Sequence, residues 1–140
     1  MELKLHSIED ISAVAQSIIE YADNHKIWVF EGEMGAGKTT LVKAICKHLD
    51  IIDETSSPTF SLVNVYVDDV GKEYYHFDFY RLNHEVEALD IGCDEYFYSG
   101  NHCFIEWGEK IPSLIPSRNL KISIKLSPDN TRIISLSKHD

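Results

Sequence analysis

The eight residues from Gly32 to Thr39, GEMGAGKT, constrain the fold of this chain more than any other segment, because they match the pattern G-x-x-x-x-G-K-[ST]. The apolar run Ile27 to Phe30 before them predicts a buried parallel strand, and residues 40–49 after them predict a helix. In this order the glycines let backbone N–H groups turn towards a phosphate, and the helix N-terminus adds its positive dipole end. A chance glycine-rich turn would not explain the correct flanks on both sides.

The motif gives its residues distinct roles. Lys38 is expected to reach the outer phosphates of a nucleotide, and Thr39 to offer its hydroxyl to Mg²⁺. For Trp107 a place in the core is the default, and a place beside the nucleotide is the sharper hypothesis. The complete set of expected nucleotide contacts is Glu33, Met34, Gly35, Ala36, Gly37, Lys38, Thr39, Thr40 and Trp107.

Two carboxylates are candidates for catalysis, which needs a metal-binding acid and a group that orients the attacking water. Glu106 follows the short apolar strand predicted at 103–105, the place where a second acid usually stands beside a phosphate loop. Asp78 lies in a segment whose alternation separates Tyr75, Phe77 and Phe79 from His76, Asp78 and Tyr80. Solvation on a polar strand face is the alternative for both acids.

Thr59 is a third catalytic candidate. It ends the polar stretch 53–58, which predicts a mobile loop. In switch proteins with a phosphate loop, such a threonine reaches Mg²⁺ or the γ-phosphate only in the triphosphate state. A simple turn residue after Pro58 is the alternative.

Composition limits the classes of function. The 140 residues favour a single domain spanning 1–140, and 44% hydrophobic residues suffice for a core. A formal net charge of −10 argues against direct nucleic-acid binding, which depends on Lys and Arg. The cysteines, Cys46, Cys93 and Cys103, form no C-x-x-C pair, so neither a disulfide framework nor a zinc site is indicated. This cysteine usage fits a reducing cytoplasm best. The sequence predicts neither a signal peptide nor a membrane-spanning segment.

The remaining pattern predicts an α/β fold with a mixed central sheet flanked by helices. Ser7 and Asp10 form a capping box at the start of an amphipathic segment. Asp68 to Gly71 reads as the turn of an antiparallel hairpin, and Gly92 makes one predicted helix doubtful. The expected elements are helices at 7–24, 40–49 and 82–98, strands at 27–30 and 103–105, and hairpins at 60–67 with 73–80 and at 120–126 with 132–136.

Four blocks in order resemble the TsaE family, the small bacterial P-loop ATPases of tRNA threonylcarbamoyladenosine biosynthesis. The blocks are GEMGAGKTT at 32–40, SPTF at 57–60, HFDFYRL at 76–82 and IEW at 105–107. Their common spacing is far more specific than a phosphate loop alone. Met34, Phe79 and Gly108 depart mildly from the family pattern, and no block after Lys110 can be matched.

The resemblance implies a cytoplasmic ATPase that uses ATP and Mg²⁺ and acts with the proteins TsaB and TsaD. It implies only indirect contact with tRNA and no association with a membrane. It implies that Thr59 belongs to a switch segment, and that Asp78 and Glu106 are needed for hydrolysis near Mg²⁺.

Other readings remain open at the level of sequence. Asp68 to Gly71 satisfies the D-x-x-G pattern of GTPases, but it falls at a predicted turn, and the chain has no [NT]-K-x-D segment. A small-molecule kinase would need an arginine-bearing lid, and the chain has only Arg81, Arg118 and Arg132. A binding module that signals nucleotide occupancy with negligible hydrolysis is the third alternative.

Overall fold

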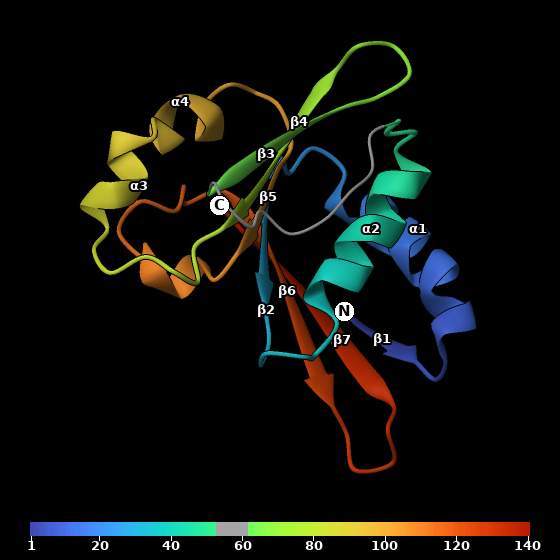
Figure 1. The fold of residues 1–140 in the computed structure, drawn as a ribbon. Helices are drawn as coiled ribbons and strands as arrows, with labels where there is room; N and C mark the ends of the chain where they lie inside the picture. Colours follow the sequence, from blue (N-terminus) through green and yellow to red (C-terminus); the bar gives the residue numbers. More distant parts are fainter. Residues whose placement is uncertain (53–61) are drawn as a thin grey trace.

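A seven-stranded mixed sheet runs through the part of the chain that the computed structural model describes, residues 1–52 and 62–140 (Figure 1). Its order is β1-β7-β6-β2-β5-β4-β3. The neighbours β6, β2, β5 and β4 run parallel, whereas β1, β7 and β3 pair antiparallel. The strands are β1 (Glu2–Leu5), β2 (Ile27–Glu31), β3 (Val63–Val67), β4 (Glu73–Asp78), β5 (Cys103–Glu106), β6 (Asn119–Leu126) and β7 (Arg132–His139).

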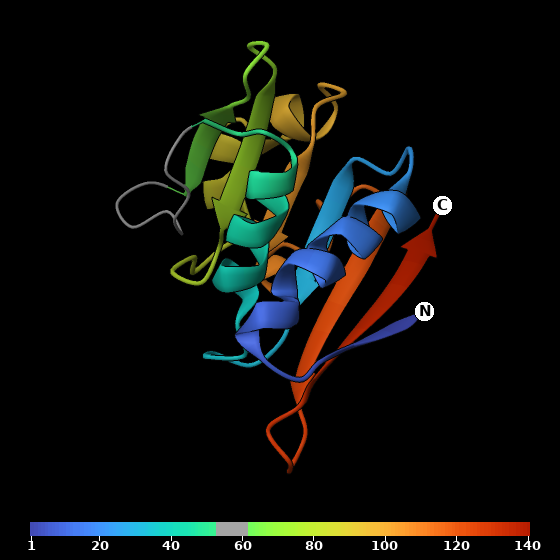
Figure 2. The ribbon, with the colours of Figure 1, turned by 90° about the vertical axis from the view of Figure 1, so that its right-hand side faces the viewer.

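Helices cover both faces of the sheet. Figure 2 shows α1 and α2 side by side in front of it, and Figure 1 shows α3 and α4 on the opposite side. The helical elements are η1 (Ile8–Asp10), α1 (Ile11–Ala22), α2 (Lys38–His48), α3 (Val86–Asp90), α4 (Cys93–Phe97) and η2 (Gly108–Lys110), where η marks a 3₁₀ turn. Within the described ranges, no helix is both long and apolar enough to cross a membrane.

The central strand β2 divides the interior into two cores. Trp28 and Phe30 belong to the core under α1 and α2, whereas Ile27 and Val29 belong to the core under α3 and α4. Strands that are buried on both faces are apolar at every position, which explains the unbroken run at 27–30. The predicted α/β fold with a mixed sheet is thereby confirmed.

The helices differ from the predicted ones at their ends. The segment expected at 7–24 begins with the 3₁₀ turn η1, although the Ser7 N–H does donate to Asp10 Oδ2 at 3.2 Å. Helix α2 begins at Lys38 rather than at residue 40, because the left-handed Gly37 already ends the loop. The single helix expected at 82–98 is wrong. Gly92, at φ 81°, separates two short helices there.

The strands also differ from expectation at the edges. β1 was not predicted, because its pairing with β7 is decided by contacts across the whole chain length. β4 ends at Asp78 rather than at Tyr80, and β5 extends to Glu106. The expected strand at 60–67 begins outside the described residues, and β3 is described from Val63.

Candidate nucleotide-binding site

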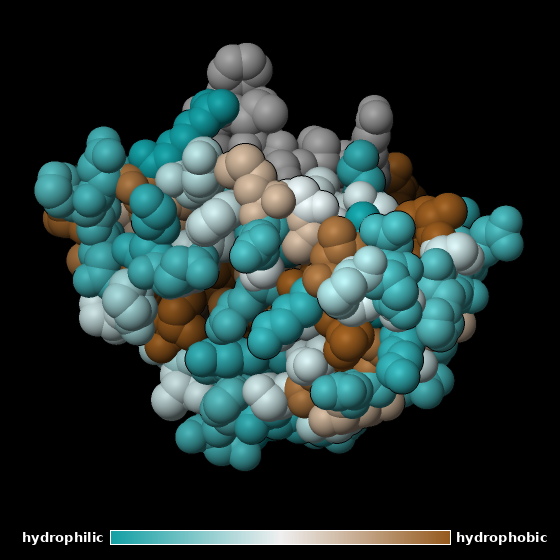
Figure 3. Space-filling model, turned by 90° about the horizontal axis from the view of Figure 1, so that it is seen from below, coloured by the Kyte–Doolittle hydropathy of each residue, from teal (hydrophilic) through white to brown (hydrophobic). Residues whose placement is uncertain are grey.

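The candidate site lies where the parallel strands β2, β5 and β4 end together. β-Register places Glu106 of β5 beside both Phe30 of β2 and Asp78 of β4. Because carboxyl ends of parallel strands meet at one edge, the loop after β2 and the two predicted acids share that edge. The view in Figure 3 looks onto it and shows a mainly hydrophilic surface with hydrophobic patches between the polar groups.

The loop after β2 has the backbone that a phosphate cradle needs. A Cβ on Gly32 would stand 2.8 Å from the Ile124 carbonyl oxygen, so the close approach of loop and β6 requires glycine. Gly37 has φ 104°, a left-handed conformation that side chains rarely adopt, and it turns the chain into α2. The first N–H groups of α2 therefore point into the loop, where an anion can bind them.

Lys38 is held inside the loop. Its side chain is buried, its Nζ donates to the Gly32 carbonyl at 2.9 Å, and it lies 3.9 Å from the centroid of the Trp107 ring. Trp107 has a left-handed φ of 60°, and its ring lies 4.9 Å from that of Tyr80. Trp107 therefore lies beside the phosphate loop, and its place beside a nucleotide stays a prediction.

Thr39 and Glu106 are in hydrogen-bond contact beside the loop. The Thr39 hydroxyl donates to the two Glu106 carboxylate oxygens at 3.3 and 3.4 Å, and Glu106 is only 3% exposed. The alternative of a solvated Glu106 is therefore wrong.

A buried hydrogen-bonded chain supports Glu106 from behind. His76 Nε2 lies 2.6 Å from Glu106 Oε2, and the Tyr66 hydroxyl lies 2.8 Å from His76 Nδ1. Sequence alternation placed His76 on the polar face of its strand, but the side chain is fully buried. The only sequence feature that could have marked His76 as part of the site is its position two residues before Asp78, on the same face of the strand. Tyr66, on the neighbouring β3, offered none.

Asp78 lies at the end of β4 with its side chain partly exposed. Its Oδ1 accepts the Tyr80 N–H at 3.0 Å. Burial raises the pKa of Asp78 above its ordinary value, and repulsion from the nearby Glu106 carboxylate raises it further. Two acids that repel each other in this way favour a cation between or beside them.

The donor set fits Mg²⁺. A threonine hydroxyl and carboxylate oxygens are hard ligands of the kind Mg²⁺ prefers, and phosphate oxygens and waters usually complete its octahedron. Thr39, Asp78 and Glu106 line one hollow of about 800 Å³, partly open to solvent. In the described ranges no three His, Cys, Asp or Glu side chains converge on one point, so a metal here would depend on the Thr39 hydroxyl and on phosphate.

The structure places most of the predicted nucleotide contacts around the same hollow. Ala36 is buried under the loop, Thr40 is exposed on the first turn of α2, and Glu33 is exposed at the loop tip. Thr59 lies outside the described residues. The predicted residues that line the hollow are Met34, Gly35, Gly37, Lys38, Thr39, Thr40, Asp78, Glu106 and Trp107.

Arg132 also lines this hollow, and sequence analysis missed it. It begins β7, and its Nε donates to the Ala36 carbonyl at 2.9 Å. No local pattern marks position 132, because the contact joins segments 96 residues apart.

The D-x-x-G segment has no part in the site. Asp68 accepts hydrogen bonds from the N–H groups of Val70 and Lys72 and from the Tyr74 hydroxyl. The turn joins β3 to β4 at the opposite edge of the sheet from the loop (Figure 1). The predicted hairpin turn is confirmed, and the GTPase reading loses its support.

Comparisons with known proteins agree on one family. The family model described as threonylcarbamoyl adenosine biosynthesis protein TsaE matches residues 5–134. The TsaE protein of Bacillus subtilis is 36% identical over 92% of this chain and 80% of its own length. That of Treponema pallidum is 34% identical over 94% and 96%, respectively. The crystal structure of Bacillus subtilis YdiB superposes with a TM-score of 0.81 at 29% identity, covering 100% of this chain and 86% of that one.

Proposed function

The chain belongs to the TsaE family of tRNA threonylcarbamoyladenosine biosynthesis, and within it we propose that this protein binds ATP with Mg²⁺ and hydrolyses it. The observation that carries the proposal is the contact of the Thr39 hydroxyl with the buried Glu106 carboxylate, at the mouth of a loop that also holds Lys38. A purely structural glycine turn would need neither a buried lysine nor a buried acid, since both are costly to bury.

Binding begins with an exchange of partners at Lys38. Its ammonium group gives up the Gly32 carbonyl and the face of Trp107 for the outer phosphates, while the N–H groups at the start of α2 hold the phosphate oxygens. Thr39, Glu106 and Asp78 would hold Mg²⁺, which would neutralise part of the negative charge on the phosphates.

Hydrolysis requires a water in line with the γ-phosphorus. Glu106 is positioned to accept a hydrogen bond from that water, because His76 fixes the carboxylate from the other side. Attack by the water oxygen breaks the bond between the γ-phosphorus and the bridging oxygen, so ADP, phosphate and a proton leave. Asp78, next to Glu106 across the strand pair, adds negative charge that favours the cation.

We further propose that this cycle serves the TsaB and TsaD pair, which transfers the threonylcarbamoyl group to tRNA, and that contact with tRNA is indirect. Family membership supports this partner choice, and so does the acidic charge of the chain.

Phosphate release from ATP tests the proposal. We expect slow Mg²⁺-dependent turnover by the chain alone, a higher rate with TsaB and TsaD, and no turnover by Lys38→Ala in either condition. The absence of Mg²⁺-dependent turnover in both conditions would favour the nucleotide-dependent binding module instead.

A further inference from the structure

Three buried polar side chains form a diagonal line across β3, β4 and β5. In the antiparallel pair, Tyr66 stands opposite Tyr74, and His76 lies two residues further along β4. In the parallel pair, His76 stands opposite Phe104, and Glu106 lies two residues further along β5. Steps of two residues keep side chains on one face of a sheet, so Tyr66, His76 and Glu106 share the face that α1 and α2 cover.

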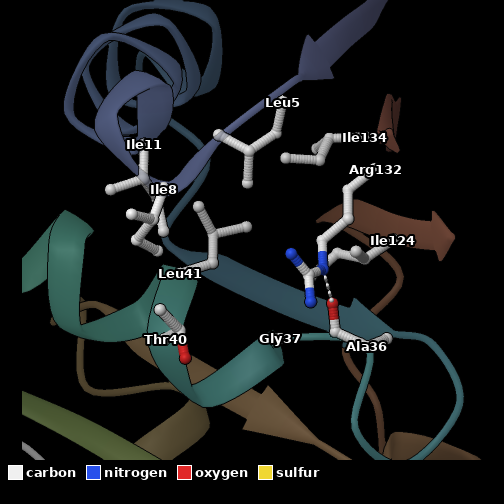
Figure 4. Close-up of a pocket in the computed structure, with 10 residues that line it drawn as sticks. All are labelled: Leu5, Ile8, Ile11, Ala36, Gly37, Thr40, Leu41, Ile124, Arg132 and Ile134. Atoms are coloured by element: carbon white, nitrogen blue, oxygen red, sulfur yellow. Dashed lines mark hydrogen bonds between the residues drawn. The ribbon is translucent and has the colours of Figure 1, made fainter. Parts of the chain in front are cut away.

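Tyr66 approaches the candidate site from an edge strand that carries none of its motifs. In the sheet order, β3 lies three positions from β2, on the side opposite to the β6–β7 hairpin. That hairpin supplies the contact of Arg132 with the Ala36 carbonyl, which Figure 4 shows against the loop. The two sides of the site therefore depend on different distant segments, and Tyr66 belongs to the side of Glu106.

The contacts along the diagonal line fix where the protons lie. A carboxylate can only accept hydrogen bonds, so the 2.6 Å contact between His76 Nε2 and Glu106 Oε2 needs a proton on Nε2. The other nitrogen of a neutral imidazole is then an acceptor. The Tyr66 hydroxyl lies 2.8 Å from His76 Nδ1 and donates to it. In this way the Tyr66 hydroxyl selects one tautomer of His76.

Burial makes this selection strict. His76 is fully buried and Tyr66 and Glu106 are each 3% exposed, so solvent does not reach either contact. If the proton moved to Nδ1, the lone pair of His76 Nε2 would face the carboxylate. The carboxylate would then lose a hydrogen bond in a low-dielectric interior and would turn away from the ring.

We propose that Tyr66 is a positioning residue for ATP hydrolysis, an inference that rests on the proposed function. Its hydroxyl holds the proton of His76 on Nε2, and that N–H holds one oxygen of the Glu106 carboxylate. Glu106 then presents its remaining lone pairs to the hollow beside the phosphate loop, which it lines. Because Tyr66 does not line that hollow, loss of its hydroxyl should slow the chemical step and leave nucleotide binding intact.

Tyr66→Phe tests the proposal, because it removes the hydroxyl and keeps the ring. We expect single-turnover release of phosphate from ATP to slow about tenfold, the effect of one ordinary hydrogen bond, both alone and with TsaB and TsaD. Affinity for ADP with Mg²⁺ should change less than about twofold. Tyr75→Phe is the matched control: it loses the same atom on the opposite face of β4, where the hydroxyl contacts Glu73 and Asn101. It should leave the rate and the affinity unchanged.

Nuclear magnetic resonance gives a second readout that does not depend on activity. Long-range couplings between ring protons and ¹⁵N identify the tautomer of each histidine, and the signal that disappears in His76→Gln assigns His76 among the seven. We expect the proton on Nε2 in wild type and a mixture of both tautomers in Tyr66→Phe. A purely structural role for Tyr66 would not change the tautomer.

Several outcomes would overturn the positioning role while leaving the proposed function in place. These are a proton on Nδ1 of His76 in wild type, and a Tyr66→Phe variant that keeps the wild-type tautomer or the wild-type rate. Equal slowing by Tyr75→Phe, or a loss of ADP affinity as large as the loss of rate, would overturn it as well. Wild type that hydrolyses no ATP, alone or with TsaB and TsaD, would overturn the proposed function and the positioning role with it.

Discussion

At the scale of single residues, Lys38 is a buried cation. Phosphate oxygens can take the place of its two contacts, the Gly32 carbonyl and the Trp107 ring. Lys38→Ala removes the ammonium group that would contact the outer phosphates, and a hydrogen bond to a charged group is worth about 1.5–3 kcal/mol. We therefore expect ATP affinity to fall by at least about tenfold. Titration with ATP and Mg²⁺ measures it. Lys43→Ala, exposed on the same helix, is the control that should bind normally. Unchanged affinity in Lys38→Ala would exclude the phosphate-loop assignment.

Glu106 should separate binding from catalysis. Glu106→Gln keeps the size of the side chain and can still contact Thr39 and His76, but it loses the charge beside the reacting phosphate. We expect ADP affinity to persist and the rate of hydrolysis to fall about 10²-fold or more. Single-turnover phosphate release is the measurement, with exposed Glu109→Gln as the control. A near-normal rate would leave Glu106 with a structural role only.

At the scale of elements, the β6–β7 hairpin is the unit that carries both Ile124 and Arg132 to the loop. Its turn is tied by Asp129, which accepts hydrogen bonds from the Ser127 hydroxyl and from the Thr131 N–H. These bonds, that of Ser127 first, lower the pKa of Asp129 from 3.8 to about 2. The ionised form is therefore the one that the folded hairpin favours.

Because the pKa of Asp129 is lowered in the folded protein, the stability should increase with pH. A carboxyl with a lowered folded pKa adds stability above its unfolded value of 3.8, and this contribution disappears as the pH falls towards about 2. We expect wild type to be more stable than Asp129→Asn at about pH 5 and the difference to vanish near pH 2. Urea unfolding across this range measures it, with Asp69→Asn in the exposed β3–β4 turn for comparison. A difference independent of pH would show that the Asp129 charge is not involved.

At the scale of the whole molecule, the net negative charge limits which macromolecules the isolated protein can bind. With 23 acidic against 13 basic residues, few cations are available to displace counterions from RNA. We expect no gel shift of tRNA by the isolated chain at physiological salt, but co-elution with TsaB and TsaD that depends on nucleotide. Gel filtration with ADP, with a triphosphate analogue and without nucleotide makes the comparison. Strong binding of tRNA by the chain alone, with no protein complex, would contradict the proposed partners.

The sequence by itself determined the strand, loop and helix around the nucleotide motif, because each is a local pattern of a few adjacent residues. Lys38, Thr39 and Glu106 could be named as candidates for the same reason, because each follows a recognisable strand or glycine pattern. The hairpin turn at Asp68 was also readable, since Asp and Gly favour turns wherever they stand together.

Only the tertiary structure decided which distant segments meet at that loop. The pairing of β1 with β7, the Tyr66 and His76 support behind Glu106, and the Arg132 contact with Ala36 all join residues without any shared local pattern. Their partners are selected by sheet order and by packing on the two cores, which depend on the whole chain at once. Local periodicity does not encode these pairings, so the strand, loop and helix were predictable from the sequence and these distant contacts were not.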